Sequence, residues 1–372
     1  MRFLFTTAVL PSHLYALVPL AWSLRAAGHD VLVCTLDNFL PTVQRAGLPV
    51  TSCGPAMEFA AFMRPLEGGM HRAAGRGWAR LAAHTLPGTR AVVEAFRPDV
   101  VVHELTEFAG PVAACAAGTP WVEVRWGVGP LPEYRSAAEE ELMPALAALG
   151  LPGLPLPRTV IDPWPPSMRR PHAAAHRSVR FVAYDEDACL PDWLLAARRR
   201  PRLCVTLGTV LPRHAGPATA LRFIATLATA VVSRLDAEVV VGVYDDLARR
   251  WKNRPAGVRH AGWLPLAQAI AASDAVVHHG GQQTMLTALA AGLPQVVIPH
   301  IADQFDNADA LVAAGAGIGL AREEASVGAV VKACAELLDR KSYAAAATAL
   351  AEEIAAQPTP ADLVPALCEV AG

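Results

Sequence analysis

The chain has 372 residues, of which 53% are hydrophobic and 18% are charged, and its formal net charge is -2. This length predicts two domains, because a domain commonly holds about 100–200 residues. The near-zero charge argues against a nucleic-acid-binding protein, and the apolar content excludes a wholly disordered chain.

The seven cysteines indicate a reducing compartment. Their number is odd, no C-x-x-C occurs, and no Cys/His cluster has the spacing of a zinc site. The apolar run at the start of the chain ends at Pro11 without a cleavage motif, and no uninterrupted apolar stretch approaches the ~20 residues of a membrane span. We therefore expect a cytoplasmic protein without membrane insertion or a metal site.

The first half of the chain alternates short apolar runs with helical patterns. A helical pattern from Leu14 to Leu24 follows a loop that contains His13, includes Pro19 and stops at Gly28. Strands are predicted at 2–7, 31–34, 100–103 and 121–124. This alternation is typical of βαβ units, in which helices cover both faces of a parallel sheet.

The alternation breaks between about 152 and 200, where prolines crowd, and a second α/β half follows. Its strands are predicted at 202–207, 238–243, 274–278 and 295–299. The openings of the two halves are alike, T-T-A-V-L-P-S-H and T-L-G-T-V-L-P-R-H. We predict an N-terminal domain at 1–185, a linker at 186–200 and a C-terminal domain at 201–350. A helical tail at 351–372 is expected to pack back on the first domain. The active site is expected in the crevice between the domains.

The stretch D-A-V-V-H-H-G-G-Q-Q-T at 274–284 predicts an anion site. A buried strand ends at His278, two glycines turn the chain, and a helix begins near Gln282. Unpaired N–H groups at a helix start, with the positive end of its dipole, bind anions, and a histidine can donate to the same anion. A βα turn with incidental histidines remains the alternative.

This stretch, followed by L-T-A-L-A-A-G-L-P-Q-V-V-I-P and A-D-Q-F-D-N-A, resembles the donor-binding signature of GT-B glycosyltransferases. The chain is most similar to the actinobacterial enzymes that glycosylate antibiotic natural products with activated deoxysugars. The resemblance covers nearly the whole chain. It implies an α/β GT-B fold, in which two Rossmann-like, doubly wound domains face each other across a cleft. It also implies a nucleoside-diphosphate sugar donor, a hydrophobic aglycone acceptor such as a polyketide, and neither a cofactor nor a required metal.

The resemblance assigns donor-binding roles along the second half. His278 and the turn amides contact the diphosphate, while Asp303 and Gln304 hold the sugar hydroxyls. Trp263 lies against the nucleobase. The full predicted donor set is Thr209, Trp263, Leu264, His278, Gly280, Gly281, Gln282, Gln283, Thr284, Asp303 and Gln304. Many relatives carry Gly where this chain has Gln283, which leaves the turn's geometry open. The residues alone are equally consistent with other roles, in which Asp303 and Gln304 cap the next helix and Trp263 is a core residue.

The catalytic prediction rests on His13, which matches the general base of these enzymes. An imidazole near neutral pH can take a proton from an acceptor hydroxyl. A carboxylate commonly orients such a base, and Glu104 occupies the family's acidic position, with Asp99 and Glu107 as weaker candidates. This chain departs from the family's usual opening at Ser12, where relatives have Gly. The resemblance implies an inverting displacement at the anomeric carbon.

Aromatic and methionine side chains among glycines suggest an acceptor pocket. The candidates are Phe59, Met63, Trp78 and Trp126, whose adaptable surface suits a flat aglycone, although ordinary core explains them too. Two alternatives stay open, a nucleotide-sugar epimerase of the same fold and a non-catalytic activator of another transferase. A homodimer or a helper protein is also left open.

Two further motifs are interpreted as decoys. The D-x-D at 185–187 is expected to be solvated acid rather than a metal site, because it falls in the linker. The G-A-G-I-G at 315–319 follows a helical pattern and is expected to lead into a strand rather than bind a dinucleotide. His214 matches His13 in the internal repeat, but nothing else supports a chemical role for it.

The donor nucleotide is predicted from Leu286, eight residues after His278. In relatives that use ribose donors a Glu at this position binds the ribose hydroxyls. A leucine there would leave a ribose 2′-hydroxyl without a partner, at a cost of about 1–3 kcal/mol. The sequence therefore predicts a deoxyribose donor, that is dTDP.

Overall fold

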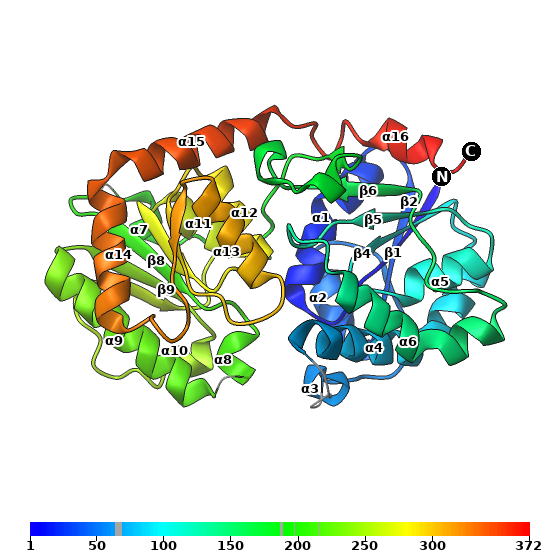
Figure 1. Ribbon diagram of the computed structural model, residues 1–372, viewed down its shortest axis with the longest axis horizontal. Helices are drawn as coiled ribbons and strands as arrows, with labels where there is room; N and C mark the ends of the chain where they lie inside the picture. Colours follow the sequence, from blue (N-terminus) through cyan, green and yellow to red (C-terminus); the bar gives the residue numbers. More distant parts are fainter. Residues whose placement is uncertain (64–68, 187–188, 197, 215) are drawn as a thin grey trace.

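Two parallel β-sheets organise the chain, and each is the centre of one lobe (Figure 1). The computed structural model describes residues 1–63, 69–186, 189–196, 198–214 and 216–372. Every strand pairing in both sheets is parallel. The two Rossmann-like domains predicted from the sequence, each built on a parallel sheet, are confirmed.

The first sheet has seven strands in the order β3-β2-β1-β4-β5-β6-β7. The strands are β1 (Arg2–Thr6), β2 (Asp30–Thr35), β3 (Val50–Ser52), β4 (Val100–Glu104), β5 (Trp121–Val124), β6 (Thr159–Asp162) and β7 (Arg177–Ser178). The helices of this lobe are α1 (Pro11–Ala26), α2 (Leu40–Arg45), α3 (Phe59–Phe62), α4 (Met70–Phe96), α5 (Ala109–Ala116) and α6 (Pro132–Ala148). The four predicted strands are present. The proline-rich stretch, expected to lack the alternation, contributes β6 and β7.

The second sheet has six strands in the order β10-β9-β8-β11-β12-β13. They are β8 (Arg202–Thr206), β9 (Glu238–Gly242), β10 (Val258–Gly262), β11 (Ala275–His278), β12 (Gln295–Val297) and β13 (Gly317–Gly319). The helices from this part of the chain to its end are α7 (Asp192–Leu195), α8 (Leu211–His214), α9 (Pro217–Leu235), α10 (Asp245–Ala248), α11 (Leu266–Ala271), α12 (Gln282–Ala290), α13 (Gln304–Ala313), α14 (Val327–Asp339), α15 (Lys341–Ala356) and α16 (Val364–Glu369). β13 lies where the glycine-rich decoy motif was expected to lead into a strand.

The two sheets share one topology, and this topology places the site. In each, the first strand lies between the second and the fourth, so that β1 pairs with β2 and β4 while β8 pairs with β9 and β11. The chain departs in opposite directions on either side of that first strand. Such a switch point leaves a crevice at the carboxyl ends of the strands. The segments after β1, β4, β8 and β11 are therefore the ones that face a ligand.

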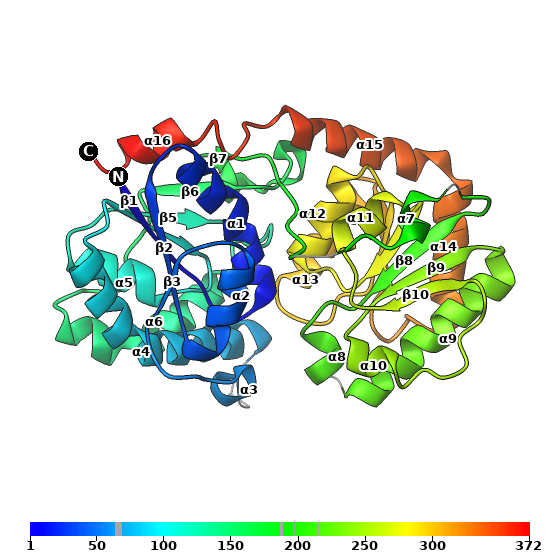
Figure 2. The ribbon, with the colours of Figure 1, turned by 180° about the vertical axis from the view of Figure 1, so that it is seen from behind.

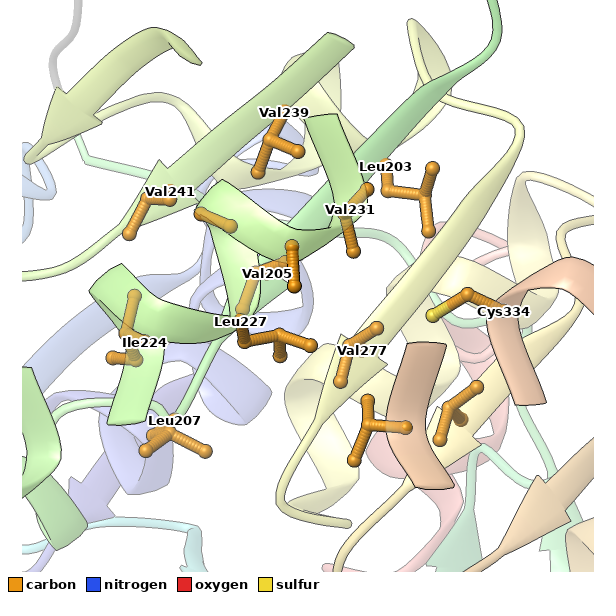
Figure 3. Close-up of a cluster of buried hydrophobic side chains, with 14 of the residues drawn as sticks. Leu203, Val205, Leu207, Ile224, Leu227, Val231, Val239, Val241, Val277 and Cys334 are labelled. Carbon is orange, nitrogen blue, oxygen red and sulfur yellow. The ribbon is translucent and has the colours of Figure 1, made fainter. Parts of the chain in front are cut away.

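The core of the second lobe lies between the sheet and its helices (Figure 3). Leu203, Val205 and Val277 of the strands meet Leu227 and Val231 of α9. The strands are almost continuously apolar because parallel strands are covered on both faces. α9 is long and apolar enough to cross a membrane by length and composition alone, and no other such helix is found in the described part of the chain. Its contacts with the sheet are those of a core helix.

A separate apolar cluster joins the two lobes. Val128, Trp164 and Phe181 from the first half of the chain pack with residues of the second half that include Leu286 and Leu311. Buried apolar contact of this kind holds the lobes in a defined relation.

The end of the chain also connects the lobes. α15 runs along the second lobe, and the chain then crosses so that α16 lies on the first lobe beside the N-terminus (Figures 1 and 2). Leu363, Val364 and Leu367 are buried against the first sheet's core. The domain boundaries themselves stay a prediction.

Candidate active site

The cleft between the lobes encloses a cavity of about 560 Å³. Its walls include His13 and Trp126 from the first lobe, and His279, Trp263 and Asp303 from the second. Volumes of about 300–1,000 Å³ are usual for small-molecule sites. The cavity therefore has room for a substrate that touches both lobes.

His13 lies in the first turn of α1, not in a loop as the sequence suggested. α1 begins at Pro11, which is a favourable residue at the first helical position because its ring fixes φ. The helix continues through Pro19 and ends at Ala26, and Gly28 follows in the left-handed region with φ 86°. Placement in a helix holds the imidazole more firmly than a loop does. His13 is buried and still lines the cleft.

Glu104, the last residue of β4, holds the His13 imidazole. The Nδ1 of His13 lies 3.0 Å from Oε1 of Glu104 and 2.9 Å from the hydroxyl of Thr106. Thr106 fixes the carboxylate in turn, because its backbone N–H and its hydroxyl donate to Glu104 at 2.7 Å and 2.8 Å. An Nδ1–H donated to this carboxylate leaves Nε2 as the basic nitrogen. Sequence reasoning missed Thr106.

The electrostatics of this pair keep Glu104 ionised. Complete burial works against the charged carboxylate, but the charge and hydrogen bond of His13 and the two bonds from Thr106 outweigh it, so the pKa of Glu104 lies below its usual range. An ionised carboxylate at Nδ1 favours the imidazolium that forms when Nε2 takes a proton. This arrangement is that of a general base and its orienting group.

The two weaker carboxylate candidates lie elsewhere. Asp99 accepts from the backbone N–H of Arg2 at 2.7 Å, at the opposite end of the sheet. Glu107 is buried at the start of α5 and accepts from the N–H groups of Ala109 and Gly110. Burial raises the pKa of Glu107. Neither side chain contacts His13.

Aromatic rings surround His13 on the acceptor side. The rings of Trp78 and Trp126 lie 5.0 Å and 5.1 Å from the imidazole. Met63, Trp78 and Trp126, which the sequence predicted to contact the aglycone, all line the cavity. Phe59 lies in α3, and its side chain is outside the described part of the structure. Tyr134, which also lines this end, was missed.

The two histidines of the glycine turn face opposite ways. His278 is fully buried, with its Nε2 2.7 Å from Oε1 of Gln295 and its Nδ1 accepting from the N–H of Gly280 at 3.0 Å. It does not line the cleft, and both of its ring nitrogens are already bonded, so its ring is not placed for the donor contact that the sequence predicted. His279 does line the cleft. A Cβ at Gly208 would lie 2.5 Å from the ring of His279, so a glycine is required there, where φ is +70°.

Unpaired polar groups mark the anion site at the start of α12. His279 and Gln283 line the cavity wall, and His279 Nδ1 and Gln283 Nε2 are buried without a hydrogen-bond partner. Burial lowers the pKa of His279 to about 3, with His278 and His300 nearby, so the ring is neutral at pH 7 and retains one N–H donor. Gly281 is the N-cap of α12, and Thr284 lies in its first turn, also on the cavity wall. Buried donors without partners at a helix N-terminus fit an oxyanion.

Two members of the predicted donor set are engaged by protein groups. Gln282 Oε1 accepts from the N–H of Gly127 at 2.6 Å and from the indole of Trp164 at 2.8 Å. The carbonyl of Gly280 accepts from Asn307 at 3.0 Å. Gln282 therefore contacts the first lobe rather than offering its side chain to a donor.

Asp303 and Gln304 lie at the start of α13 and on the cavity wall. Asp303 Oδ2 accepts from Asn307 at 2.7 Å, whereas Oδ1 is buried without a partner. Burial raises the pKa of Asp303 to about 7. Gln304 Oε1 accepts from the N–H groups of His300 and Ile301, so it also closes the preceding loop. Asn307 was missed, since the sequence offers no signal beyond its position one turn after Asp303.

The far end of the cavity carries the predicted nucleobase contacts. Trp263 is 37% exposed and stacks on Tyr244 with ring centroids 5.8 Å apart. Thr209 and Leu264 also line the cavity. Leu286 does not, because it is fully buried in the cluster between the lobes. Its neighbour Thr287 lines the cavity, so the argument from Leu286 to the donor nucleotide was wrong.

The first two residues of the D-x-D decoy, Asp185 and Glu186, contact other protein groups and are not simply solvated. Asp185 accepts from the N–H of Ala267 at the start of α11, and burial raises the pKa of Asp185 to about 6. Glu186 accepts from the hydroxyl of Tyr15 and lies 3.4 Å from Arg45. Asp187, and the side chain of His214, lie outside the described residues. In the described part of the chain no three His, Cys, Asp or Glu side chains are grouped to hold a metal.

Comparisons with known proteins agree with this geometry. The models for the N-terminal and C-terminal domains of erythromycin biosynthesis protein CIII-like proteins match residues 69–208 and 226–370. Among curated relatives, the L-demethylnoviosyl transferase of Streptomyces niveus is 39% identical, over 97% of this chain and 96% of the relative. The tylactone mycaminosyltransferase of Streptomyces fradiae is 32% identical, over 99% of this chain and 92% of the relative.

Solved structures of similar sequence share the whole fold. Glycosyltransferase SsfS6 of Streptomyces sp. SF2575, in complex with thymidine diphosphate, superposes with a TM-score of 0.87 at 36% identity, over 99% of both chains. Spinosyn rhamnosyltransferase SpnG, solved with thymidine diphosphate and with spinosyn aglycone, superposes with a TM-score of 0.88 at 32% identity, over 99% of this chain and 100% of that one.

Proposed function

The chain belongs to the erythromycin biosynthesis protein CIII-like family of natural-product glycosyltransferases, and from this premise we propose that it transfers a deoxysugar from dTDP to a hydrophobic aglycone with inversion at the anomeric carbon. One observation carries the proposal. A base with its orienting carboxylate, His13 and Glu104, faces unpaired donors at the start of α12 across a single cavity.

The acceptor is activated from the first lobe. His13 Nε2 takes the proton of the acceptor hydroxyl as its oxygen bonds to the anomeric carbon. Glu104 stabilises the imidazolium that results, since its ionised oxygen lies 3.0 Å from Nδ1. Trp78 and Trp126 flank this end and offer flat apolar surface to the aglycone. With the base and the leaving group on opposite sides of the sugar, attack occurs opposite the departing phosphate, which inverts the configuration.

The leaving group is held from the second lobe. When the bond between the anomeric carbon and the phosphate oxygen breaks, negative charge grows on the diphosphate. The N–H groups at the start of α12, the Nδ1 of His279 and the amide of Gln283 are placed to stabilise it. Asp303 Oδ1, which is buried without a partner, suits a hydroxyl of the donor sugar. These groups make a divalent cation unnecessary.

The choice of dTDP rests on the relatives, whose structures were solved with thymidine diphosphate. Trp263 and Tyr244 offer a stacking surface for the base. The related structure with spinosyn aglycone supports an aglycone acceptor.

An epimerase or an activator partner is less well supported, because the curated relatives are named transferases and the base has an acceptor pocket beside it. The reducing cytoplasm suits the seven cysteines, all of which are free thiols; a homodimer or helper protein stays a prediction.

Two measurements test the proposal. The product formed from a dTDP-sugar of known configuration is analysed by NMR, and we expect the opposite anomeric configuration. Calorimetry compares dTDP with UDP, and we expect tighter binding of dTDP. Retention of the donor's configuration would contradict the inverting mechanism, while equal or tighter binding of UDP would contradict the choice of nucleotide.

A further inference from the structure

A short segment after β5, Arg125–Gly129, lies between the two lobes and is held by side chains of the second. The N–H of Gly127 donates to Oε1 of Gln282 at 2.6 Å, and the N–H of Val128 donates to Oδ1 of Asn307 at 3.0 Å. Nε2 of Gln282 returns a longer bond to the carbonyl of Arg125 at 3.4 Å. The backbone of this segment is therefore bound by the buried side-chain amides of Gln282 and Asn307, which belong to the second lobe.

The segment is closely fitted to α13. Gly127 has φ +76°, and a Cβ there would lie 3.0 Å from the Cβ of Asp303. A Cβ at Gly129 would lie 2.1 Å from Oδ2 of Asp306. Side chains at these two positions would push the segment away from the donor lobe, so the contact depends on glycine.

The same segment carries an aromatic wall of the base. Trp126 lies between Arg125, whose carbonyl accepts from Gln282, and Gly127, whose N–H donates to the same side chain. Its ring centroid is 5.1 Å from that of His13. A shift of the backbone at Gly127 or Val128 therefore moves the indole against the imidazole.

The two amides also belong to the donor end. Gln282 is the first residue of α12, whose N–H groups bind the diphosphate in the proposed function. Asn307 donates to the carbonyl of Gly280 at 3.0 Å and to Oδ2 of Asp303 at 2.7 Å. Each amide thus joins one part of the donor site to the segment that positions Trp126.

We propose that Gln282 and Asn307 are positioning residues that couple the donor site to the general base through the segment Arg125–Gly129. The inference rests on the proposed function and adds to it the route by which the donor lobe sets the geometry at His13. When a bound donor fixes the positions of α12 and Asp303, these hydrogen bonds also fix the position of Trp126. The acceptor pocket is complete only when the donor is bound. Neither residue touches the reacting atoms.

The test uses the full chain with Gln282→Met, Gln282→Glu and a control, Glu353→Ala. Methionine fills the space of glutamine but accepts no strong hydrogen bond, whereas glutamate keeps an oxygen for Gly127 and Trp164. The control removes a hydrogen bond from the Ser167 N–H to Glu353, 3.1 Å long and far from the cleft.

The expected results separate positioning from folding. Gln282→Met lowers kcat by about 10- to 100-fold, as misplacement of reacting groups does, while the Kd for dTDP from calorimetry stays within about threefold of the native value. Gln282→Glu regains most of kcat, and Glu353→Ala stays at the native value. In fluorescence titrations with dTDP, the signal that Trp126→Phe removes is also absent in Gln282→Met.

Several outcomes would overturn the inference. They are a native kcat in Gln282→Met, an equal loss in Gln282→Glu, or a Trp126 signal that persists without Gln282. If Gln282→Met does not fold, Asn307→Asp replaces it, since aspartate keeps the acceptor for Val128 and loses the two donated bonds. If the native chain transfers no sugar, the proposed function fails, whereas the Trp126 signal on dTDP binding still decides this inference.

Discussion

His278 and His279 are adjacent in the chain but have opposite environments. His278 ends β11 with both ring nitrogens bonded, while Nδ1 of His279 is unpaired on the cleft wall. We expect His279→Ala to weaken dTDP binding by about 10-fold or more, the usual loss for a hydrogen bond to a charged group. His278→Ala is expected to lower thermal stability instead. Calorimetry and thermal denaturation of both variants check this, and a larger loss of dTDP affinity in His278→Ala would reverse the assignment.

The sequence motif could not tell the two histidines apart. Successive side chains at a strand end point to opposite faces, so a phase error of one residue exchanges a buried ring for a ligand contact. The same error of one position on α12 exchanges Leu286, in the core, for Thr287, in the cleft. His13 and Asp303, which the resemblance singled out, line the cavity, and Glu104 lies against His13.

Asp303 makes the stability of the unliganded protein depend on pH. Burial raises its pKa from 3.8 to about 7. The folded chain therefore binds this proton more tightly than the unfolded chain, and the stability present below the unfolded pKa is lost as pH rises through the folded value. Asp303→Asn stays neutral, so we expect its melting temperature to rise relative to the native protein between about pH 4 and pH 8. A difference that is constant across this range would show that Asp303 titrates normally.

At the scale of elements, the proposed mechanism gives the glycine turn and α12 the role that a metal ion would have at the diphosphate. In this mechanism the N–H groups at the helix start, with the positive end of the helix dipole, and an N–H donor from the neutral His279 ring stabilise the diphosphate without a divalent cation. We expect turnover to survive excess EDTA with less than about a twofold change. Complete loss on chelation, restored by Mg²⁺ or Mn²⁺, would require a cation in the mechanism.

The elements themselves could be predicted where they are long and periodic. α1 and the strands at 100–103 and 202–207 carry clear apolar patterns, and all are present. The missed strands are short, such as β7 with two residues and β3 with three. They form because a parallel neighbour pairs with them, and a single sequence holds no record of that pairing. The hydrogen bonds between the segment Arg125–Gly129 and the second lobe could not be predicted for the same reason.

At the scale of the whole molecule, the end of the chain stabilises the first lobe. Leu367 of α16 is 1% exposed and packs in the core of the first sheet. We expect Leu367→Ala to lower the free energy of unfolding by about 2–5 kcal/mol, the usual range for a buried leucine. Glu369→Ala, on the exposed side of the same helix, should change it little. A loss equal to that of the control, in denaturant unfolding, would show that α16 is not part of this core.

In the proposed mechanism the two lobes divide the reaction between them, with the base on one side and the donor groups on the other. The sequence predicted this division from its two α/β halves and from the positions of His13 and the glycine turn. It could not predict the shared apolar cluster or the bonds of Gln282, because both depend on how the lobes meet.

The most direct test of this account is a comparison of turnover and donor binding in His13→Ala. Because His13 and the diphosphate groups lie on different lobes, we expect kcat to fall by about 10²–10⁴-fold while the Kd for dTDP stays within about twofold of the native value. Glu104→Gln, which removes the charge behind the base, should lower kcat in the same way without changing dTDP binding. Native turnover in His13→Ala would contradict the account.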